Sequence, residues 1–429
     1  MEKVIKFCIL LIFNAIMLFS CENDTYQEKT LVNVEIATQP IKKTYNIGDV
    51  FDITGMLVTA FFDDGSIEPV DITSDMLIYD FTNAGIDIPV TVSITHNGVT
   101  KTADIKGVTV IKPIEYELGP LRKILDGYVV KVIAFDSKGN AWIGTQRQGV
   151  IRYNEEETIV YNAENSALPQ DLFIWSIDVD KNDNVWIGSD SGAWKYDGKE
   201  FMLYNSSNTV MPEDIVWNVA VDAQNNIWFA SSRFRRGGLV RYDGTTWQAY
   251  TPDNSPLPTN SINGIAIDQS NNVWLSLSDY TNQAFLVKIS NDSWDVYDEN
   301  DFGFKPYYLG GIQCDSKSRL WVSIDYSLSS ALRAPAPHFF IFDGNNTTQL
   351  SYSNNINTWD LGSRITIDHN DYVWHHGVGA GCRVWIDMQW KEFERSYFGG
   401  SSVWVIKEDP KNKLWFGTEN GIYIQQCIE

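Results

Sequence analysis

The sequence predicts an all-β protein in which a small β-sandwich precedes a seven-bladed β-propeller. The main observation is an Asp that is followed six residues later by a Trp. This spacing recurs seven times, at Asp136/Trp142, Asp180/Trp186, Asp222/Trp228, Asp268/Trp274, Asp315/Trp321, Asp368/Trp374 and Asp409/Trp415. Successive Trp residues of these pairs are 44, 42, 46, 47, 53 and 41 positions apart. A period of this size indicates repeated small sheets, each of which must stack on its neighbours to bury its faces.

The first twenty residues have the composition of a secretory signal. Lys3 and Lys6 precede an apolar run from Phe7 to Phe19. Such a run is too short to cross a membrane as a helix and has the length of a signal-peptide core. We therefore expect residues 1–20 to be a targeting segment outside the folded domains.

The end of this run, Leu18-Phe19-Ser20-Cys21, resembles the bacterial lipoprotein box. The resemblance implies that Cys21 becomes a lipidated N-terminus, with residues 21–30 as a tether; the alternative is a plain signal peptide with an incidental Cys. Glu22-Asn23-Asp24 resembles the surface-export signal of Bacteroidetes lipoproteins. We expect an outer-membrane lipoprotein, with exposure at the cell surface left open. Acyl chains contribute ~0.8 kcal/mol per buried CH2, so we expect membrane contact through the lipid anchor only.

Acidic residues dominate the charge of the chain. The formal net charge is −22, and without residues 1–20 it becomes −23, from 54 acidic and 31 basic residues. This balance excludes nucleic acid as an expected partner, because phosphate binding requires clustered Lys and Arg. The remaining cysteines lack the spacing of a disulfide framework or a zinc site. Only Asp180–Asn184 approaches the oxygen spacing of a calcium loop. We expect no metal and no cofactor.

Residues 31–112 have the pattern of a small sandwich. Short alternating strands at 32–36, 56–60 and 90–94 are separated by turns, among them Asn97-Gly98, a strong hairpin signal. The segment Tyr45–Asp49 and the turn Asp64-Gly65-Ser66 resemble bacterial Ig-like domains. The resemblance implies a spacer and no catalytic group.

Residues 113–429 contain four strand-like segments in each repeat. A strand such as Ile174–Val179 leads into the Asp, and a strand such as Trp142–Thr145 contains the Trp. A Gly-led strand such as Gly238–Asp243 and a short fourth strand such as Trp247–Tyr250 complete the repeat. Seven such repeats predict a seven-bladed propeller.

The last repeat ends at Gly421–Cys427 and has no room for a fourth strand. We predict that Ile114–Leu118 supplies it, which joins the two ends of the ring and leaves no long open sheet edge.

Two stretches of these repeats carry a family resemblance. The run from Asp136 to Thr145 and the stretch Asn254–Pro258 look like two-component-regulator propeller repeats. That family occurs in the sensor halves of bacterial polysaccharide-responsive kinases. No kinase segment follows the repeats in this sequence, so we do not expect the chain to signal by itself.

Candidate functional residues are those at which the repeats differ. The fifth residue before each repeat Asp falls at the start of the innermost strand, at one rim of the central channel. These residues are Lys131, Trp175, Trp217, Asn263, Gly310, Ser363 and Trp404. Because aromatic faces stack well on sugar rings, we predict ligand contacts by Trp175, Trp217 and Trp404. The alternative is that these Trp residues are inter-blade filler.

Loops after the Trp strand should open on the same rim. The longest are expected at 231–237, 278–283 and 325–338, and they contribute Arg233, Tyr280 and Arg333, with Arg147 and Arg364 nearby. Because Arg binds carboxylate and sulfate in a bidentate manner, we predict that the rim binds an anionic glycan or another surface polymer. The alternative is that these are solvated loop charges.

His375-His376 follows Trp374 in the sixth repeat, where other repeats have Ile-Gly. A His at the channel rim could act as a general base, as in propeller-type polysaccharide and streptogramin lyases. A lyase using His375 or His376 is therefore the alternative to a binding protein, although no partner acid or base is evident and a non-enzyme is favoured. A protein-interaction platform is the third hypothesis.

Overall fold

The computed structural model describes residues 28–112, 116–233, 236–279, 283–291, 293–306, 308–324, 338–350, 364–377, 381–387 and 389–426. Contacts between residues divide the chain into two units, residues 1–113 and 114–429. The expected signal segment, Cys21, Tyr280 and Arg333 lie outside the described residues, as does the side chain of Arg233. Within the described residues, no helix is both long and apolar enough to cross a membrane.

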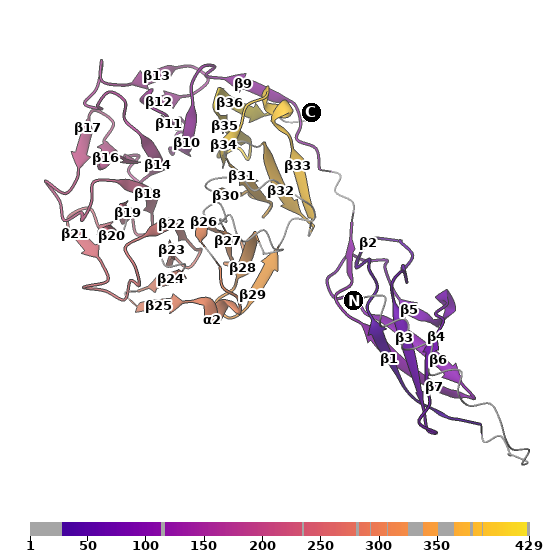
Figure 1. The fold of residues 1–429 in the computed structure, drawn as a ribbon. Coiled ribbons are helices and arrows are strands. Elements are labelled where there is room, and N and C mark those ends of the chain that lie inside the picture. Colours follow the sequence, from indigo (N-terminus) through magenta and orange to yellow (C-terminus); the bar gives the residue numbers. More distant parts are fainter. Residues whose placement is uncertain are drawn as a thin grey trace, which may run out of the picture. The chain divides into compact units, whose positions relative to one another are not determined.

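The first unit is a small β-sandwich built from two three-stranded antiparallel sheets and one two-stranded parallel pair (Figure 1). One sheet has the order β1-β3-β4 and the other the order β5-β6-β7, with β2 paired to β8. The strands are β1 (Leu31–Thr38), β2 (Thr44–Asn46), β3 (Leu57–Phe62), β4 (Ile67–Val70), β5 (Leu77–Tyr79), β6 (Val90–His96), β7 (Val99–Ile105) and β8 (Thr109–Ile111), with a 3-10 turn η1 (Ser74–Met76).

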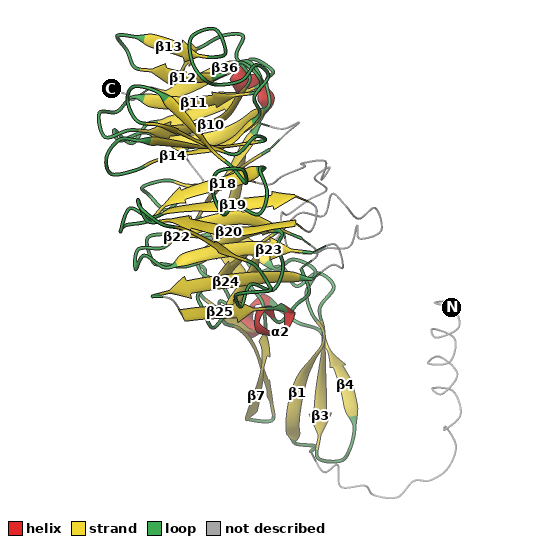
Figure 2. Ribbon diagram, turned by 90° about the vertical axis from the view of Figure 1, so that its left-hand side faces the viewer, coloured by secondary structure: helices red, strands yellow, loops and turns green. Residues whose placement is uncertain are grey.

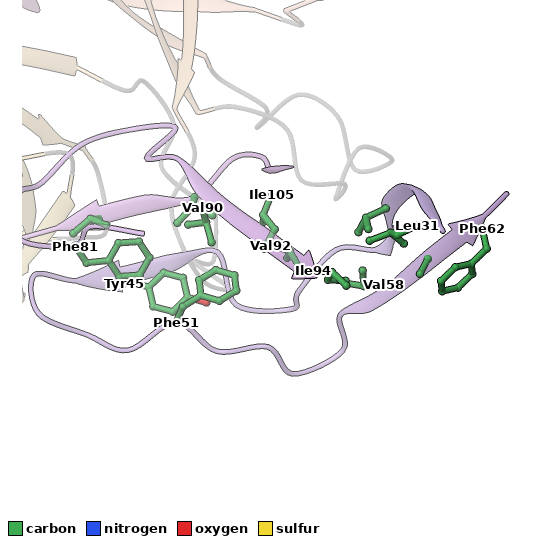
Figure 3. Close-up of a cluster of buried hydrophobic side chains, with 14 residues drawn as sticks. Leu31, Tyr45, Phe51, Val58, Phe62, Phe81, Val90, Val92, Ile94 and Ile105 are labelled. Carbon is green, nitrogen blue, oxygen red and sulfur yellow. The ribbon is translucent and has the colours of Figure 1, made fainter. Parts of the chain in front are cut away.

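Alternating side chains form the core of this unit. Val90, Val92 and Ile94 of β6 point inward at every second position, toward Tyr45 and the other apolar residues shown in Figure 3. The predicted Asn-Gly turn joins β6 to β7, with Asn97 at φ 49° and Gly98 at φ 78°. Both residues have positive φ, which is the conformation that such tight hairpin turns require.

The second unit contains seven four-stranded antiparallel sheets within the described residues (Figures 1 and 2). The first three are β10 (Val130–Phe135), β11 (Ala141–Thr145), β12 (Val150–Tyr153) and β13 (Thr158–Tyr161); β14 (Ile174–Val179), β15 (Val185–Ser189), β16 (Ala193–Tyr196) and β17 (Phe201–Tyr204); and β18 (Val216–Val221), β19 (Ile227–Arg233), β20 (Arg236–Tyr242) and β21 (Trp247–Tyr250). The next three are β22 (Ile262–Ile267), β23 (Val273–Ser278), β24 (Ala284–Ser290) and β25 (Ser293–Tyr297); β26 (Leu309–Cys314), β27 (Leu320–Ile324), β28 (Phe339–Phe342) and β29 (Thr347–Leu350); and β30 (Arg364–Ile367), β31 (Val373–His376), β32 (Cys382–Ile386) and β33 (Gln389–Phe393).

The seventh sheet joins the two ends of this unit. It has the order β34-β35-β36-β9, with β34 (Val403–Glu408), β35 (Leu414–Thr418), β36 (Gly421–Gln425) and β9 (Leu121–Ile124). The innermost strand of each sheet contacts the innermost strands of the sheets before and after it, and β34 contacts β10. The chain therefore forms a closed ring, with short helical turns at α2 (Glu299–Phe302) and η2 (Arg395–Phe398).

The closing strand differs from the predicted one. An N-terminal segment does complete the last sheet, but it is Leu121–Ile124, which pairs from Leu121 with Gln425 to Ile124 with Ile422. Of the predicted segment 114–118, the described residues 116–118 are not in a strand. Leu118 is instead buried among the apolar side chains between the sixth and seventh sheets, so this stretch fills space rather than forming a ladder.

The repeated Asp–Trp pair is part of the scaffold, as predicted. In every repeat the Asp Oδ2 accepts a hydrogen bond from the Trp indole Nε1, at distances between 2.8 and 3.1 Å. The Oδ1 atom accepts backbone N–H groups two and four residues further along, as Asp136 does from Lys138 and Asn140. One carboxylate thus accepts the backbone N–H groups of a tight turn and also holds a buried Trp in place.

Candidate functional site

The predicted rim residues coincide with β-bulges in the innermost strands. Between Val130 and Val132 the strand β10 advances two residues while its partner β11 advances one, so Lys131 is an extra, unpaired residue. The strands β14, β18, β22 and β34 have the same irregularity at Trp175, Trp217, Asn263 and Trp404, and β26 has it at Gly310-Gly311. A bulge releases one residue from the ladder and redirects its side chain. Ser363, the seventh predicted position, lies outside the described residues.

Three aromatic rings of the second and third sheets form a continuous row. Phe173 stacks on Trp175 at 5.4 Å between ring centroids and an interplanar angle of 11°, and Trp175 meets Trp217 at 4.4 Å. We call Phe173, Trp175 and Trp217 the aromatic row. Trp217 is 38% exposed, which is high for so large an apolar side chain. The row therefore presents aromatic surface to solvent.

Arg147 extends the aromatic row on its outer side. Its guanidinium carbon lies 4.5 Å from the centroid of the Phe173 ring. Arg147 has φ 64°, and the residue before it, Gln146, forms a β-bridge with Phe173. The loop after β11 thereby places a cation on an aromatic face, an arrangement that favours Arg.

A cationic cluster lies on β10 and on the two innermost strands that precede it in the ring, β34 and β30. The Lys131 Nζ is 3.6 Å from the centroid of the Trp404 ring, and the Arg364 Nη1 donates to the Lys131 carbonyl oxygen at 3.0 Å. We call Lys131, Arg364 and Trp404 the cationic cluster. Within the described part of the chain, neither cation of the cluster has an ion pair with an acid.

Burial disfavours charge in this cluster. Desolvation, followed by repulsion from Arg364, lowers the pKa of Lys131 from 10.5 to about 8. Desolvation also lowers the pKa of Arg364. Two like charges that are partly removed from water and not neutralised are typical of sites that bind an anion.

The rim residue of the fourth sheet, Asn263, has a structural role. Asn263 accepts a hydrogen bond from the Tyr308 hydroxyl at 2.7 Å and donates to the Leu309 carbonyl oxygen at 2.7 Å. Asn218 donates in turn to the Asn263 carbonyl oxygen at 3.1 Å. These bonds link neighbouring innermost strands, and among the described residues the candidate contacts therefore centre on β30, β34, β10, β14 and β18.

The structure thus brings together Trp175, Trp217 and Arg147 in one group and Trp404 and Arg364 in another. It adds two residues that were not among the predicted ligand contacts, Lys131 and Phe173. Lys131 stood at a rim position in the sequence, but its loss of hydration depends on neighbouring strands and has no sequence signal. Phe173 lies two residues before Trp175, and that spacing could have revealed it.

The predicted loop of the third sheet is shorter than expected. Strands β19 and β20 extend until Arg233 pairs with Arg236, so most of residues 231–237 is hairpin strand rather than open loop. Ligand roles for Arg233, Tyr280 and Arg333 remain predictions.

The two histidines of the sixth sheet lie at the same end of the sheet as Arg364, which pairs with His376, but both rings are buried. They end β31, the second strand of its sheet, and His375 and His376 are only 5% and 2% exposed. His375 packs edge-on against Phe339, and the Nε2 of His376 lies 3.4 Å from the Thr366 Oγ1. Desolvation lowers the pKa of His376 to about 3 and places the pKa of His375 well below 6.5. Both rings are therefore neutral at physiological pH and enclosed by the sheet packing, beside a small cavity that also borders Cys382 and Arg383.

Metal-binding groups are sparse in the part of the chain that the structure describes. No cluster of three or more His, Cys, Asp or Glu side chains suited to a metal occurs there. In the turn that resembles a calcium loop, the Asp180 oxygens accept hydrogen bonds from Trp186, Asn182 and Asn184, as in the other repeats. The Asp183 carboxylate accepts from Ser137.

Comparisons with known families agree with the two-unit fold. Residues 38–107 match the bacterial Ig-like domain (group 3), and residues 397–420 match the two component regulator propeller. A search of curated proteins finds no significant match to the sequence.

Solved structures with similar folds include two extracellular domains of putative hybrid two-component systems from B. thetaiotaomicron. One is 16% identical, with a TM-score of 0.55, and the match covers 91% of this chain and 51% of that one. The other is 18% identical, with a TM-score of 0.56 and coverage of 86% and 55%. A virginiamycin B lyase from Staphylococcus aureus, solved with quinupristin, is 13% identical, with a TM-score of 0.55 and coverage of 72% and 99%. This chain spans about half the length of the two extracellular domains, and at these identities the likeness shows the fold alone.

Proposed function

We propose that this protein is a lipid-anchored envelope protein whose propeller binds an acidic glycan at one rim of the ring. The observation that carries the proposal is the position of the aromatic row beside cations without acidic partners, in a chain whose net charge is −22. In so acidic a protein, unpaired basic groups at one place indicate local selection of an anion.

The aromatic row supports a ring-shaped ligand. A sugar has apolar C–H faces that pack on an indole, and Trp217 presents such a face with 38% of its surface exposed. Trp175 contacts both Phe173 and Trp217, so it supports the exposed Trp217 ring on which a sugar unit would stack.

The cationic cluster supports an acidic group on that ligand. Uronic-acid carboxylates and sulfate esters accept strong, charge-assisted hydrogen bonds from Lys and Arg. Nucleic acid carries anions too, but a chain of charge −22 would repel a long polyphosphate.

The location is supported by the sequence of the N-terminus and by the structural neighbours. Leu18–Cys21 resembles the lipoprotein box, and two of the similar solved structures are extracellular domains. Lipid labelling of Cys21 tests the anchor: palmitate incorporation into the wild type and its loss in Cys21→Ala support it, whereas equal labelling contradicts it.

Affinity electrophoresis of the full-length protein tests glycan binding. We expect retardation in gels that contain polygalacturonate or a sulfated glycan, and weaker retardation with a neutral galactan. The double variant Trp175→Ala/Trp217→Ala should migrate freely, while Trp294→Ala, on the outermost strand β25, serves as the matched control.

Three outcomes would contradict the proposal. Unchanged retardation of the double variant would exclude the aromatic row as the contact surface. If the protein released unsaturated uronate from polygalacturonate, as detected by absorbance, it would be a lyase rather than a binding protein. Absence of retardation by any glycan would favour the protein-interaction platform.

A further inference from the structure

Lys131 occupies the middle of the candidate site. Consecutive innermost strands contact each other in the order β30, β34, β10, β14 and β18. Lys131 on β10 therefore stands between Trp404 on β34 and Trp175 on β14, and all three are bulge residues. At this end of three adjacent strands, a Lys residue therefore lies between two Trp residues.

The Lys131 Nζ lies closer to its ring than do two lysines that face Trp rings of the repeats. Lys195 and Lys288 lie 5.4 and 5.3 Å from the centroids of Trp186 and Trp274. The Lys131 Nζ is at 3.6 Å from its ring, and it forms no hydrogen bond with any described residue. An ammonium group in this position has lost water without gaining an acceptor, so an incoming anion would restore its hydrogen bonding.

The Trp residues at the bulges of the two flanking strands also have unused indole N–H groups. The Nε1 atoms of Trp404 and Trp175 are buried and have no hydrogen-bond partner among the described residues. In contrast, the indoles of all seven repeat Trp residues donate to an Asp. Buried donors are normally satisfied, so two unused donors next to an unpaired cation point to a ligand with acceptor oxygens.

From this arrangement we propose that Lys131, supported by Arg364, is the anion subsite of the rim. It binds the carboxylate or sulfate of one sugar unit, whose neighbouring unit lies on the aromatic row. This inference rests on the proposed glycan binding and deepens it, because it assigns charge selection to a single side chain and ring stacking to Trp175 and Trp217.

Charge selection by Lys131 should depend on pH. The titratable groups on the strands packed around it are Asp178 on β14 and Lys407 and Glu408 on β34, with Arg364 on β30; of these, Arg364 shifts the pKa of Lys131. Because that pKa is about 8, the ammonium form is lost at higher pH. The preference for acidic over neutral oligosaccharides should therefore weaken as pH rises above this value.

Calorimetry with oligogalacturonate and a neutral galacto-oligosaccharide of equal length tests the subsite. Lys131→Met should weaken binding of the acidic oligomer by about tenfold, the loss of one charge-assisted bond, and leave the neutral one unchanged. Lys131→Arg should retain the preference, and Lys407→Met, at the opposite end of β34, is the matched control for loss of charge. Trp217→Ala should weaken binding of both the acidic and the neutral oligosaccharide. A Lys131→Met protein with undiminished acidic preference would overturn the subsite while leaving glycan binding in place.

A second measurement tests the subsite without relying on glycan binding. Acetylation of the full-length protein is followed at Lys131 by mass spectrometry, with exposed Lys407 as the internal reference. Glucuronate should slow acetylation of Lys131 and glucose should not. Equal rates with both would overturn the subsite, and protection by glucuronate in a protein that no polysaccharide retards would retain the subsite while refuting the proposed function.

Discussion

The two ends of the innermost strands have contrasting chemistry. At the end where the repeat Asp lies, each carboxylate accepts hydrogen bonds from an indole and from backbone N–H groups. At the opposite end, bulges release Lys131, Trp175, Trp217 and Trp404, and two of these indoles have no partner among the described residues. The same residue type, Trp, is thus a satisfied scaffold element at one end and a surface with unused donors at the other. The difference teaches that function in this ring is to be sought where the repeats diverge.

Truncation of whole Trp side chains should give the largest difference in stability loss between the two ends of the innermost strands. Trp374 is 0% exposed, so Trp374→Ala should destabilise the propeller by about 3–5 kcal/mol. Trp217 is 38% exposed, and Trp217→Ala should cost less than about 1 kcal/mol. Thermal unfolding followed by near-ultraviolet circular dichroism measures both, and similar losses for the two variants would refute the contrast.

Removal of a single indole N–H should also destabilise the protein more at the Asp end than at the bulge end, but by a smaller amount. Trp228→Phe deletes the 2.9 Å hydrogen bond to Asp222 and leaves a buried carboxylate oxygen with one partner fewer, at a cost of about 1–3 kcal/mol. Trp175→Phe deletes an N–H without a described partner and should change stability by less than about 0.5 kcal/mol. If Trp175→Phe proved as costly as Trp228→Phe, the rim indole would be structural after all.

Lys131 should reduce the stability of the free protein in a pH-dependent manner. Its pKa falls from 10.5 to about 8, so the charged form is disfavoured in the folded state below pH 8. Lys131→Met should therefore stabilise the ligand-free protein by about 1 kcal/mol at neutral pH, after allowance for solvent screening. As the pH rises from about 8 to 10.5, folded wild-type protein has lost the Lys131 proton while the unfolded chain still binds it. The destabilisation caused by Lys131 therefore disappears over this pH range.

Unfolding midpoints of wild type and Lys131→Met, measured across this pH range, should converge as the pH rises. Lys407→Met provides the control for loss of a positive charge on the ring. A constant difference between the wild type and Lys131→Met would show that desolvation of Lys131 is not its cause.

The histidines of the sixth sheet should show the smallest change, because their protonation state should not respond to pH near neutrality. Because burial keeps the pKa of His376 at about 3 and that of His375 well below 6.5, neither ring should titrate between pH 5 and 8. Their imidazole C–H resonances should keep the same chemical shift across this range. A titration in that window would reopen a role in acid–base chemistry.

The Asp–Trp period was sufficient to predict the repeated sheets and the scaffold role of both residues, because each repeat folds locally into the same hydrogen-bonded turn. The closing strand was misplaced because Ile114–Leu118 and Leu121–Ile124 are both short segments that combine apolar and charged residues. The choice depends on Leu118 fitting between two sheets that are far apart in sequence.

For the site, strand register carried more information than residue type. The repeat register singled out residues that lie at bulges in the structure, although no bulge was predicted there. The register also predicts burial of the two histidines. His375 and His376 occupy the places of Ile143 and Gly144 in the first repeat, which are buried. The loss of hydration at Lys131 arises between neighbouring strands of the ring, so no single repeat could reveal it.

Closure of the ring by β9 has a consequence for biosynthesis. Ile124 pairs with Ile422, so the two strands of this clasp are separated by about 300 residues of chain. Synthesis delivers the N-terminal strand first, and it must wait for almost the whole propeller before its partner exists. Until then the last sheet lacks its outer strand and exposes an unpaired edge. The final pairing of the ring therefore depends on β36, and a chain truncated before β36 would remain an open ring with an exposed sheet edge.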